Sequence, residues 1–195
     1  MTGARFVERP VVGGTQFRCL GVGSRRAFVF KLYSVAFCLE GGAADQALQQ
    51  AFESHRQTRG EELADALRQD EGFFRSLASA PGDKMIVLRL ARDVSRGRLE
   101  GALRDTLRRL LSPADVERVL QAACFPGGMR EGEVALLRSR GRDFVVHLGT
   151  ERRVLEDAGA INERLWGVWL GPQSAAANLK ESIAARAAMQ ALAVD

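Results

Sequence analysis

The spacing of apolar positions divides the chain into blocks of strands and helices. From Ala27 to Leu39 the residues are apolar at both odd and even positions, which is typical of a strand covered on both faces. Three further segments alternate between apolar and polar side chains and predict half-buried strands: Lys84–Arg92, Glu133–Arg138 and Asp143–Leu148. The last two are joined by the turn-forming sequence Ser-Arg-Gly-Arg, so we expect an antiparallel hairpin.

Glycines and helical periods organise the rest of the chain. Residues Gln16–Leu20 predict a short strand, and the glycine-spaced sequence LGVGS that follows predicts a turn leading into the apolar strand. Apolar residues then recur with the period of amphipathic helices. The helical stretches are 44–52, 59–80 (as one or two helices), 99–111, 113–123, 161–170 and 179–187.

Strands and helices in separate blocks, with antiparallel hairpins, predict an α+β fold. We expect a large, curved antiparallel sheet backed by a layer of helices. The sequence contains no break in composition and no internal repeat. We therefore expect a single domain over residues 1–195, with its core at about 11–190.

Composition excludes several classes of protein. The chain has 195 residues, of which 46% are apolar and 27% charged, as in ordinary globular domains. The longest apolar run contains Lys31 and falls short of the roughly 20 residues that a membrane-spanning helix requires. The start, MTGARFVERPVV, lacks the apolar stretch of a secretory signal. We expect a cytoplasmic protein, or a periplasmic one if an upstream signal has been removed.

The cysteines and charges add two expectations. Cys19, Cys38 and Cys124 are an odd number, widely spaced and without a CxxC pair, so we expect neither a disulfide framework nor a zinc site. Reduced thiols would fit a reducing compartment. The net charge is +4, but the arginines mostly alternate with acidic residues and no basic block contains interleaved aromatic residues. We therefore expect no nucleic-acid partner.

Common catalytic motifs are absent from the sequence. It has no GxGxxG after a strand, no Walker loop, no HExxH and no GxSxG. His55 and His147 belong to unrelated predicted elements, and packing or surface roles suit them better than metal ligation.

A cation and a phenol stand out near the apolar strand. Arg25 and Tyr33 are both odd-numbered, so on an unbroken strand they share a face with Val29, Val35 and Phe37. Such a face could hold an anionic head group and a hydrocarbon tail. However, eight residues of straight strand span about 26 Å, so both would reach one anion only if Arg25 lies on a turned-back neighbouring segment. The alternative is a surface Arg25 and a structural Tyr33.

Two segments resemble the chalcone isomerase-like family. LGVGSRRAFVFKLYSVAFCLE is similar to its N-terminal G-x-G-x-R turn and K-[VL]-Y-x-V strand, and INERLWGVWLGPQSAAANLKESI looks like its closing helices. The predicted elements between them fall in the family's order, so the resemblance covers about Val11 to Ala187. It implies an open-faced β-sandwich with a ligand cleft between sheet and helices.

The resemblance also implies site residues. Arg25 matches the arginine that steers an anion in the family, and Tyr33 matches a position that is tyrosine in the fatty-acid-binding branch and threonine in the plant enzymes. No tyrosine or asparagine donor is found near Ser95 and Ala102, and Val168 stands at or near a position that is small and polar in the enzymes. Ring closure needs donors for the developing enolate, so these departures argue against isomerase activity.

We therefore expect a non-catalytic, bacterial-type member that binds a fatty acid or similar amphipathic anion. Its predicted ligand-binding residues are Arg25, Tyr33, Val29, Val35 and Phe37. One alternative is an intramolecular lyase or isomerase that uses Arg25 on an unknown enone. Another is a haem protein, like the family's mitochondrial branch, with His147 or His55 as axial ligand. No other cofactor or metal is expected.

Overall fold

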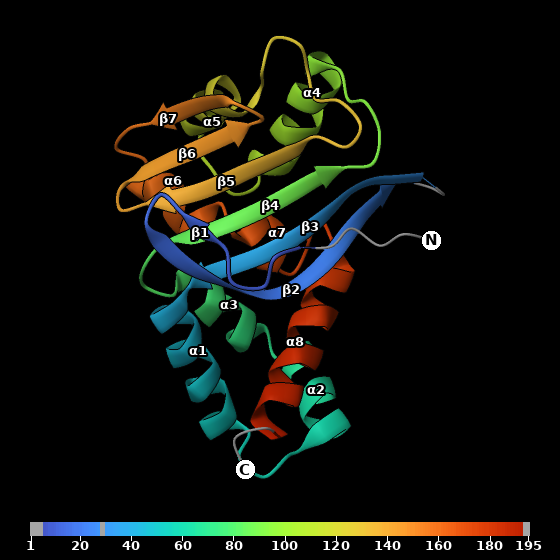
Figure 1. Cartoon of the computed structure of the whole chain (residues 1–195), viewed down its shortest axis with the longest axis vertical. Helices are drawn as coiled ribbons and strands as arrows, with labels where there is room; N and C mark the ends of the chain where they lie inside the picture. The colour runs from blue at the N-terminus through green and yellow to red at the C-terminus, as the bar shows by residue number, and fades with distance from the viewer. Residues whose placement is uncertain (1–5, 28–29, 193–195) are drawn as a thin grey trace.

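A seven-stranded sheet forms the frame of the protein (Figure 1). The computed structural model describes residues 6–27 and 30–192. The strands follow one another across the sheet in chain order, and each neighbouring pair is antiparallel. They are β1 (Val11–Val12), β2 (Thr15–Ala27), β3 (Phe30–Glu40), β4 (Lys84–Leu90), β5 (Val134–Arg140), β6 (Asp143–Leu148) and β7 (Glu151–Leu155).

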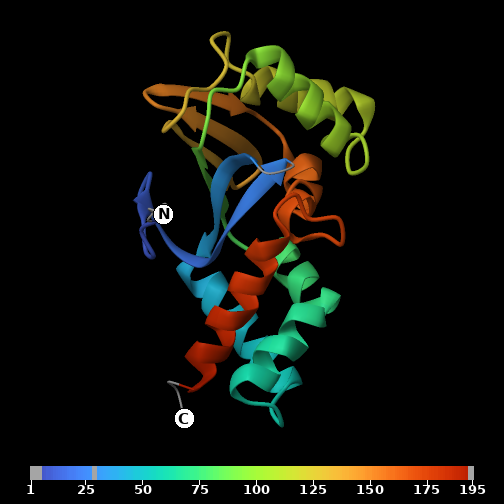
Figure 2. The ribbon, with the colours of Figure 1, turned by 90° about the vertical axis from the view of Figure 1, so that its right-hand side faces the viewer.

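Helices pack on one side of this sheet. Figure 2 shows α4, α5 and the α6–α7 region on the side opposite to the N-terminal segment, with α8 and the remaining helices extending below. The helices are α1 (Gly41–Ser54), α2 (Gly60–Gln69), α3 (Glu71–Ser79), α4 (Arg96–Leu107), α5 (Pro113–Ala123), α6 (Gly159–Arg164), α7 (Gly167–Leu170) and α8 (Ala177–Leu192). The predicted α+β class, a large antiparallel sheet backed by helices, is confirmed. Among the helices described, none is long and apolar enough to cross a membrane.

Strand β3 is covered on both faces, as its unbroken apolar pattern predicts. Val35 and Phe37 are 0% exposed and belong to the main core between the sheet and the helices. Ala36 and Cys38 point to the other face. There they join a smaller apolar cluster with Phe17, Cys19 and Met85, against which Phe6 and Val12 of the N-terminal segment pack.

The predicted turn at LGVGS is wrong, because β2 continues through it, with a shift of register against β3 between Cys19 and Gly21. The chain reverses instead between Ala27 and Phe30. The glycines instead allow α8 to pack closely against β2. A Cβ atom on Gly21 would lie 2.5 Å from Ile183 Cγ1, and one on Gly23 would lie 2.7 Å from the backbone nitrogen of Leu179.

Helix α8 also satisfies backbone donors of β2. The N–H of Val22 donates to Ser182 Oγ at 3.1 Å, and the N–H of Ser24 donates to Asn178 Oδ1 at 2.9 Å. These amides lie on the side of β2 away from β3, where an uncovered strand edge would otherwise present unpaired donors. The helix therefore fixes the half of β2 that leads to Arg25.

The expectation of three reduced cysteines is also wrong. Cys19 and Cys38 are direct partners on β2 and β3 and form a buried disulfide. Their separation of 19 residues gives no local sign of pairing, but the hairpin brings them opposite each other. Cys124 is a free, buried thiol, and burial is the main cause that raises its pKa to about 11.

Residues 59–80 form two helices, because Asp70 interrupts the helical path. Its backbone is extended, and its carboxylate accepts hydrogen bonds from the N–H groups of Gly72 (2.8 Å) and Phe73 (3.1 Å) at the start of α3. This is N-capping by an aspartate. The predicted hairpin of β5 and β6 is confirmed, whereas β7, which extends it, was not predicted.

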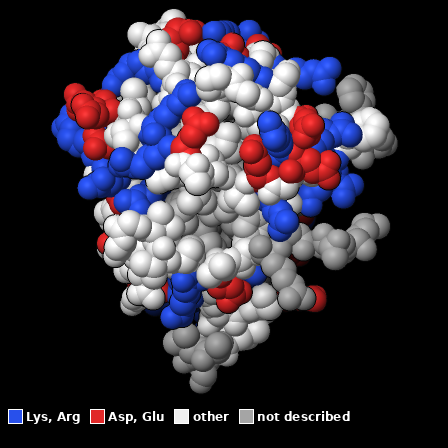
Figure 3. All heavy atoms as spheres, turned by 45° about the horizontal axis from the view of Figure 1, so that its top comes forward, with Lys and Arg blue, Asp and Glu red and all other residues white. Residues whose placement is uncertain are grey.

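Surface arginines pair with acidic residues, as their alternation in the sequence suggests. Arg96 lies 2.7 Å from Glu100, and Arg142 lies 2.7 Å from Asp157. On the face shown in Figure 3, basic and acidic side chains lie next to each other around a mainly uncharged centre.

Candidate ligand-binding site

The hairpin of β2 and β3 places Arg25 directly opposite Tyr33. Residues opposite each other in antiparallel strands have Cβ atoms roughly 5 Å apart, well within reach of one small anion. Arg25 therefore does lie on a turned-back neighbouring segment, although the reversal occurs after it and not at the glycines. Both side chains line the same cavity.

This cavity lies between the sheet and helices α4, α5 and α7. It has a volume of about 140 Å³. Most of its wall is aliphatic or aromatic, with contributions that include Leu88, Leu90, Leu103, Phe125, Met129 and Leu137. Such a wall suits a hydrocarbon group.

Four lining side chains carry polar atoms: Arg25, Tyr33, Thr106 and Trp169. The hydroxyl of Thr106 donates to the carbonyl oxygen of Ala102 at 2.8 Å and is thus engaged within α4. Trp169 is only 4% exposed, and its indole N–H forms no hydrogen bond of normal geometry within the part of the chain that the structure describes, although it lies close enough to the Tyr33 hydroxyl to influence its pKa.

Tyr33 stays a neutral phenol. Burial raises its pKa above the ordinary value of 10.0, and this effect outweighs the charge of Arg25 and the hydrogen bonds from the Trp169 and Arg25 side chains, which lower the pKa. The hydroxyl can therefore donate to an anion.

A polar groove adjoins the cavity at Arg25. Five residues line both hollows: Arg25, Ala102, Thr106, Val168 and Ala175. The groove also carries Arg26, Asp105, Arg109 and Gln173, and Arg109 Nη1 donates to Gln173 Oε1 at 2.7 Å. Arg25 thus stands where a charged, hydrated surface meets an apolar interior.

The other predicted ligand-binding residues lie elsewhere. Val35 and Phe37 share the face of Tyr33 but are fully buried in the main core and are not among the residues that line the cavity. Val29 lies outside the described residues. Sequence reasoning missed Trp169 and Thr106, since neither belongs to the apolar strand. The only feature of the sequence that could have indicated a role for Trp169 is its position directly after Val168 in the closing segment.

The two positions that lack donors do lie at the cavity. Ala102 and Val168 both line it, as the family resemblance implies for these regions. Neither side chain can form a hydrogen bond. The described lining therefore provides donors from Arg25, Tyr33 and Trp169 only.

Neither histidine lies at this cavity among the residues described. His55 caps the end of α1, where its Nε2 lies 3.1 Å from Asp70 Oδ2. His147 lies on β6 opposite Leu136, and burial, then the charges of Arg152 and Arg138, lower its pKa. The haem alternative thus has no histidine ligand here and stays a separate prediction. Over the described residues, no three His, Cys, Asp or Glu side chains group as a metal site.

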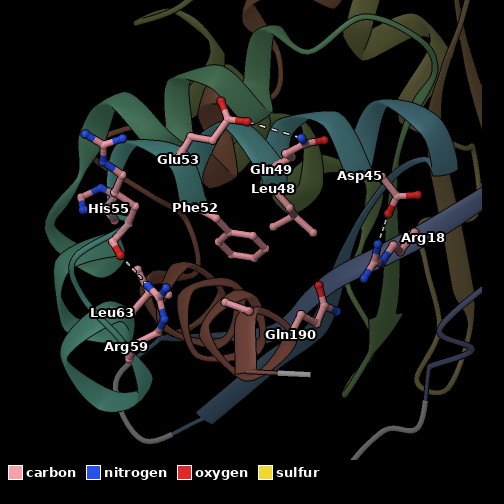
Figure 4. A pocket seen from close by; sticks show the side chains of 12 residues that line it. Arg18, Asp45, Leu48, Gln49, Phe52, Glu53, His55, Arg59, Leu63 and Gln190 are labelled. Atoms are coloured by element: carbon pink, nitrogen blue, oxygen red, sulfur yellow. Dashed lines mark hydrogen bonds and ion pairs between the residues drawn. The ribbon is translucent and has the colours of Figure 1, made fainter. Parts of the chain in front are cut away.

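His55 instead borders a third hollow, between α1, α2 and α8. Figure 4 shows Leu48 and Phe52 projecting into it from α1, with the Arg18–Asp45 ion pair at its rim. The hollow is open, and charged side chains make up much of its border. Its lining is much less apolar than that of the cavity at Tyr33.

Comparisons with known proteins identify the fold. No protein-family model and no curated protein sequence matches the chain. Among solved structures, the crystal structure of the fatty-acid binding protein AtFAP1 of Arabidopsis thaliana aligns with a TM-score of 0.65 and 16% identity. The alignment covers 95% of this chain and 94% of that chain. The chain therefore has the chalcone isomerase-like fold, which it shares with a plant fatty-acid binding protein.

Proposed function

We propose that this protein binds a small amphipathic anion, with its carboxylate at Arg25 and Tyr33 and its apolar part in the adjoining cavity. The observation that carries this proposal is the position of the Arg25–Tyr33 pair at the boundary between polar groove and apolar cavity. An amphipathic molecule has the same two-part character.

The donors around this boundary suit a carboxylate. Its two oxygens offer about four lone-pair sites. The guanidinium of Arg25 supplies charge, and the neutral hydroxyl of Tyr33 supplies a donor. The indole N–H of Trp169, beside the Tyr33 hydroxyl, offers a third.

The structural neighbour supports the same class of ligand. One protein of known structure that shares this fold is named as a fatty-acid binding protein. This likeness supports our proposal that the chain belongs to the non-catalytic, fatty-acid-binding branch of the fold. The disulfide of Cys19 and Cys38 favours an oxidising compartment such as the periplasm over the cytoplasm.

Native mass spectrometry tests the site. Wild-type protein and the Arg25→Gln variant are incubated with an extract of lipids and organic acids, freed of unbound material and weighed intact. Arg152→Gln, an exposed arginine on β7, serves as the matched control. We expect wild type and control to retain the same acid and Arg25→Gln to lose most of it. Equal retention by all three proteins would show that the site is wrongly assigned.

An isomerase is the second candidate, because Arg25 lies at an enclosed cavity as an anion-steering residue would. The geometry supports it less, since Ala102 and Val168 offer no hydrogen bond to a developing enolate. Loss of one such donor typically costs about 3–4 kcal/mol in the transition state. Incubation with chalcones and related enones, followed by absorbance, tests this role. Turnover above background that disappears in Arg25→Gln would favour the isomerase over the binding protein.

A further inference from the structure

The size of the cavity limits the apolar part of its ligand. At about 140 Å³, it is smaller than the range of about 300–1,000 Å³ that is usual for pockets holding drug-sized ligands. An apolar cavity of about 150 Å³ in another protein binds benzene, a molecule of six carbons. By this comparison, the cavity has room for about six apolar carbons.

Packed side chains close the part of the cavity away from the groove. Phe125 is 2% exposed and Met129 is 6% exposed, and neither borders the groove. The guanidinium of Arg153 lies 4.3 Å from the ring centre of Phe125 and donates to the carbonyl oxygens of Gln121 and Cys124 at 2.9 and 3.1 Å. Arg153 thus binds the C-terminal end of α5 through hydrogen bonds and stabilises the position of the Phe125 ring through a cation–π contact.

Met129 is held by backbone pairing. Its N–H donates to the carbonyl oxygen of Val94 at 2.9 Å, and its own carbonyl oxygen accepts from the N–H of Val94 at 2.8 Å. Gly128 lies so close to this segment that a Cβ atom there would stand 2.4 Å from the carbonyl oxygen of Val94. The wall formed by Phe125 and Met129 is therefore anchored on both sides.

We propose that the ligand is a medium-chain carboxylic acid, with about six apolar carbons beyond its carboxylate, and that Phe125 and Met129 set this length. This inference rests on the proposed function, because it places the carboxylate at Arg25 and Tyr33. A longer fatty acid whose tail fills the cavity has to move its carboxylate away from Arg25 and Tyr33 into the polar groove, so its additional carbons bring no gain in affinity. Phe125 and Met129 are thus specificity-determining residues for chain length.

Calorimetric titration with straight-chain acids from butanoate to hexadecanoate, each below its aggregation concentration, tests this limit. Each added methylene should tighten binding about fourfold while the cavity still has room. We expect the affinity to level off at about six apolar carbons. In Phe125→Ala the levelling point should move to acids about three carbons longer, since the surrounding structure relaxes only partly into the space. In Ala135→Val, which narrows the same cavity, it should move to shorter acids.

The outcomes separate this inference from the proposed function. A rise in affinity that continues through hexadecanoate would overturn the length limit while leaving an anion-binding site in place. Levelling at the same length in wild type and Phe125→Ala would overturn the role of this wall. If Phe125→Ala does not fold by circular dichroism, Met129→Ala takes its place with the same expected direction. Failure of every acid to bind would overturn the proposed function and this inference together.

Discussion

Arg25 and Tyr33 are direct cross-strand partners on β2 and β3, and this pairing brings two residues that are distant on one straight strand together at the candidate site. Their separation along the chain would keep them apart on one straight strand. The hairpin removes that distance and turns both toward the cavity. The site therefore depends on everything that holds β2 against β3, including the packing of α8 on Gly21 and Gly23.

The first prediction concerns the Tyr33 hydroxyl. In Tyr33→Phe the carboxylate loses one neutral donor, and such a hydrogen bond contributes about 0.5–1.5 kcal/mol. We expect the affinity for hexanoate to fall by roughly three- to tenfold in calorimetric titration. Ser34→Ala, on the opposite face of β3, should leave the affinity unchanged. An affinity in Tyr33→Phe equal to that of wild type would remove Tyr33 from the site.

The second prediction concerns the close approach of α8 to β2. In Gly23→Ala the new methyl group would lie 2.7 Å from the backbone nitrogen of Leu179, so the helix must shift. We expect the free energy of unfolding to fall by about 2–3 kcal/mol, as for an overpacked core. Chemical denaturation measures it.

Gly101→Ala is the matched control for this substitution. A Cβ atom on Gly101 meets nothing within 4 Å, and the residue lies inside α4. Alanine should therefore stabilise the protein by about 0.5–1 kcal/mol through helix propensity. A neutral or stabilising Gly23→Ala would contradict the close packing of α8.

The third prediction concerns Asp70, which caps α3 and contacts His55. Burial, the largest single influence, raises its pKa, but hydrogen bonds from His55 and from the N–H groups of Phe73 and Gly72 together lower it below 3.8. A lowered pKa in the folded protein stabilises the fold above the unfolded-state pKa, and this stabilisation is lost as the pH falls through the folded-state value.

Asp70→Ala should therefore lower the free energy of unfolding near neutral pH by about 1 kcal/mol, the usual value of an N-cap. The difference from wild type should shrink below about pH 4. Asp65→Ala, an exposed acid on α2 paired with Arg68, should change stability little at any pH. A difference for Asp70→Ala that stays constant down to acid pH would argue against the role of its charge.

The fourth prediction concerns the cysteines. A thiol reagent should find no reactive group in the native protein, because Cys124 is buried with a pKa of about 11 and the other two are joined. After denaturation it should find one thiol without reductant and three with it. Reduction should cost about 3 kcal/mol of stability, as expected for a closed loop of this length. Three thiols in the unreduced, denatured protein would show that the pair is not bonded.

Much of the fold follows from local pattern. The amphipathic periodicity predicted the positions of the helices, and the unbroken apolar run predicted that β3 is covered on both faces. Both patterns depend only on residues that are close together in the sequence. Arg25 and Tyr33 also stood out in the sequence as a cation and a phenol near the apolar strand, but they lie on two different strands and share a face only through the register of the hairpin. The sequence alone therefore determined the class of fold.

Tertiary structure decided what depends on pairing across the chain. The glycine-spaced segment was predicted to be a turn, because glycine is common both in turns and where two backbones come close together. Only the packing of α8 against Gly21 and Gly23 shows that the second reason applies here. The register of β2 and β3 places Cys19 opposite Cys38, where they form a disulfide that the spacing of cysteines in the sequence does not predict. Packing of α4, α5 and α7 against the sheet enclosed the cavity and brought Trp169 to it. Contacts between residues far apart in sequence produce no periodic pattern of apolar residues, so only the folded structure shows them.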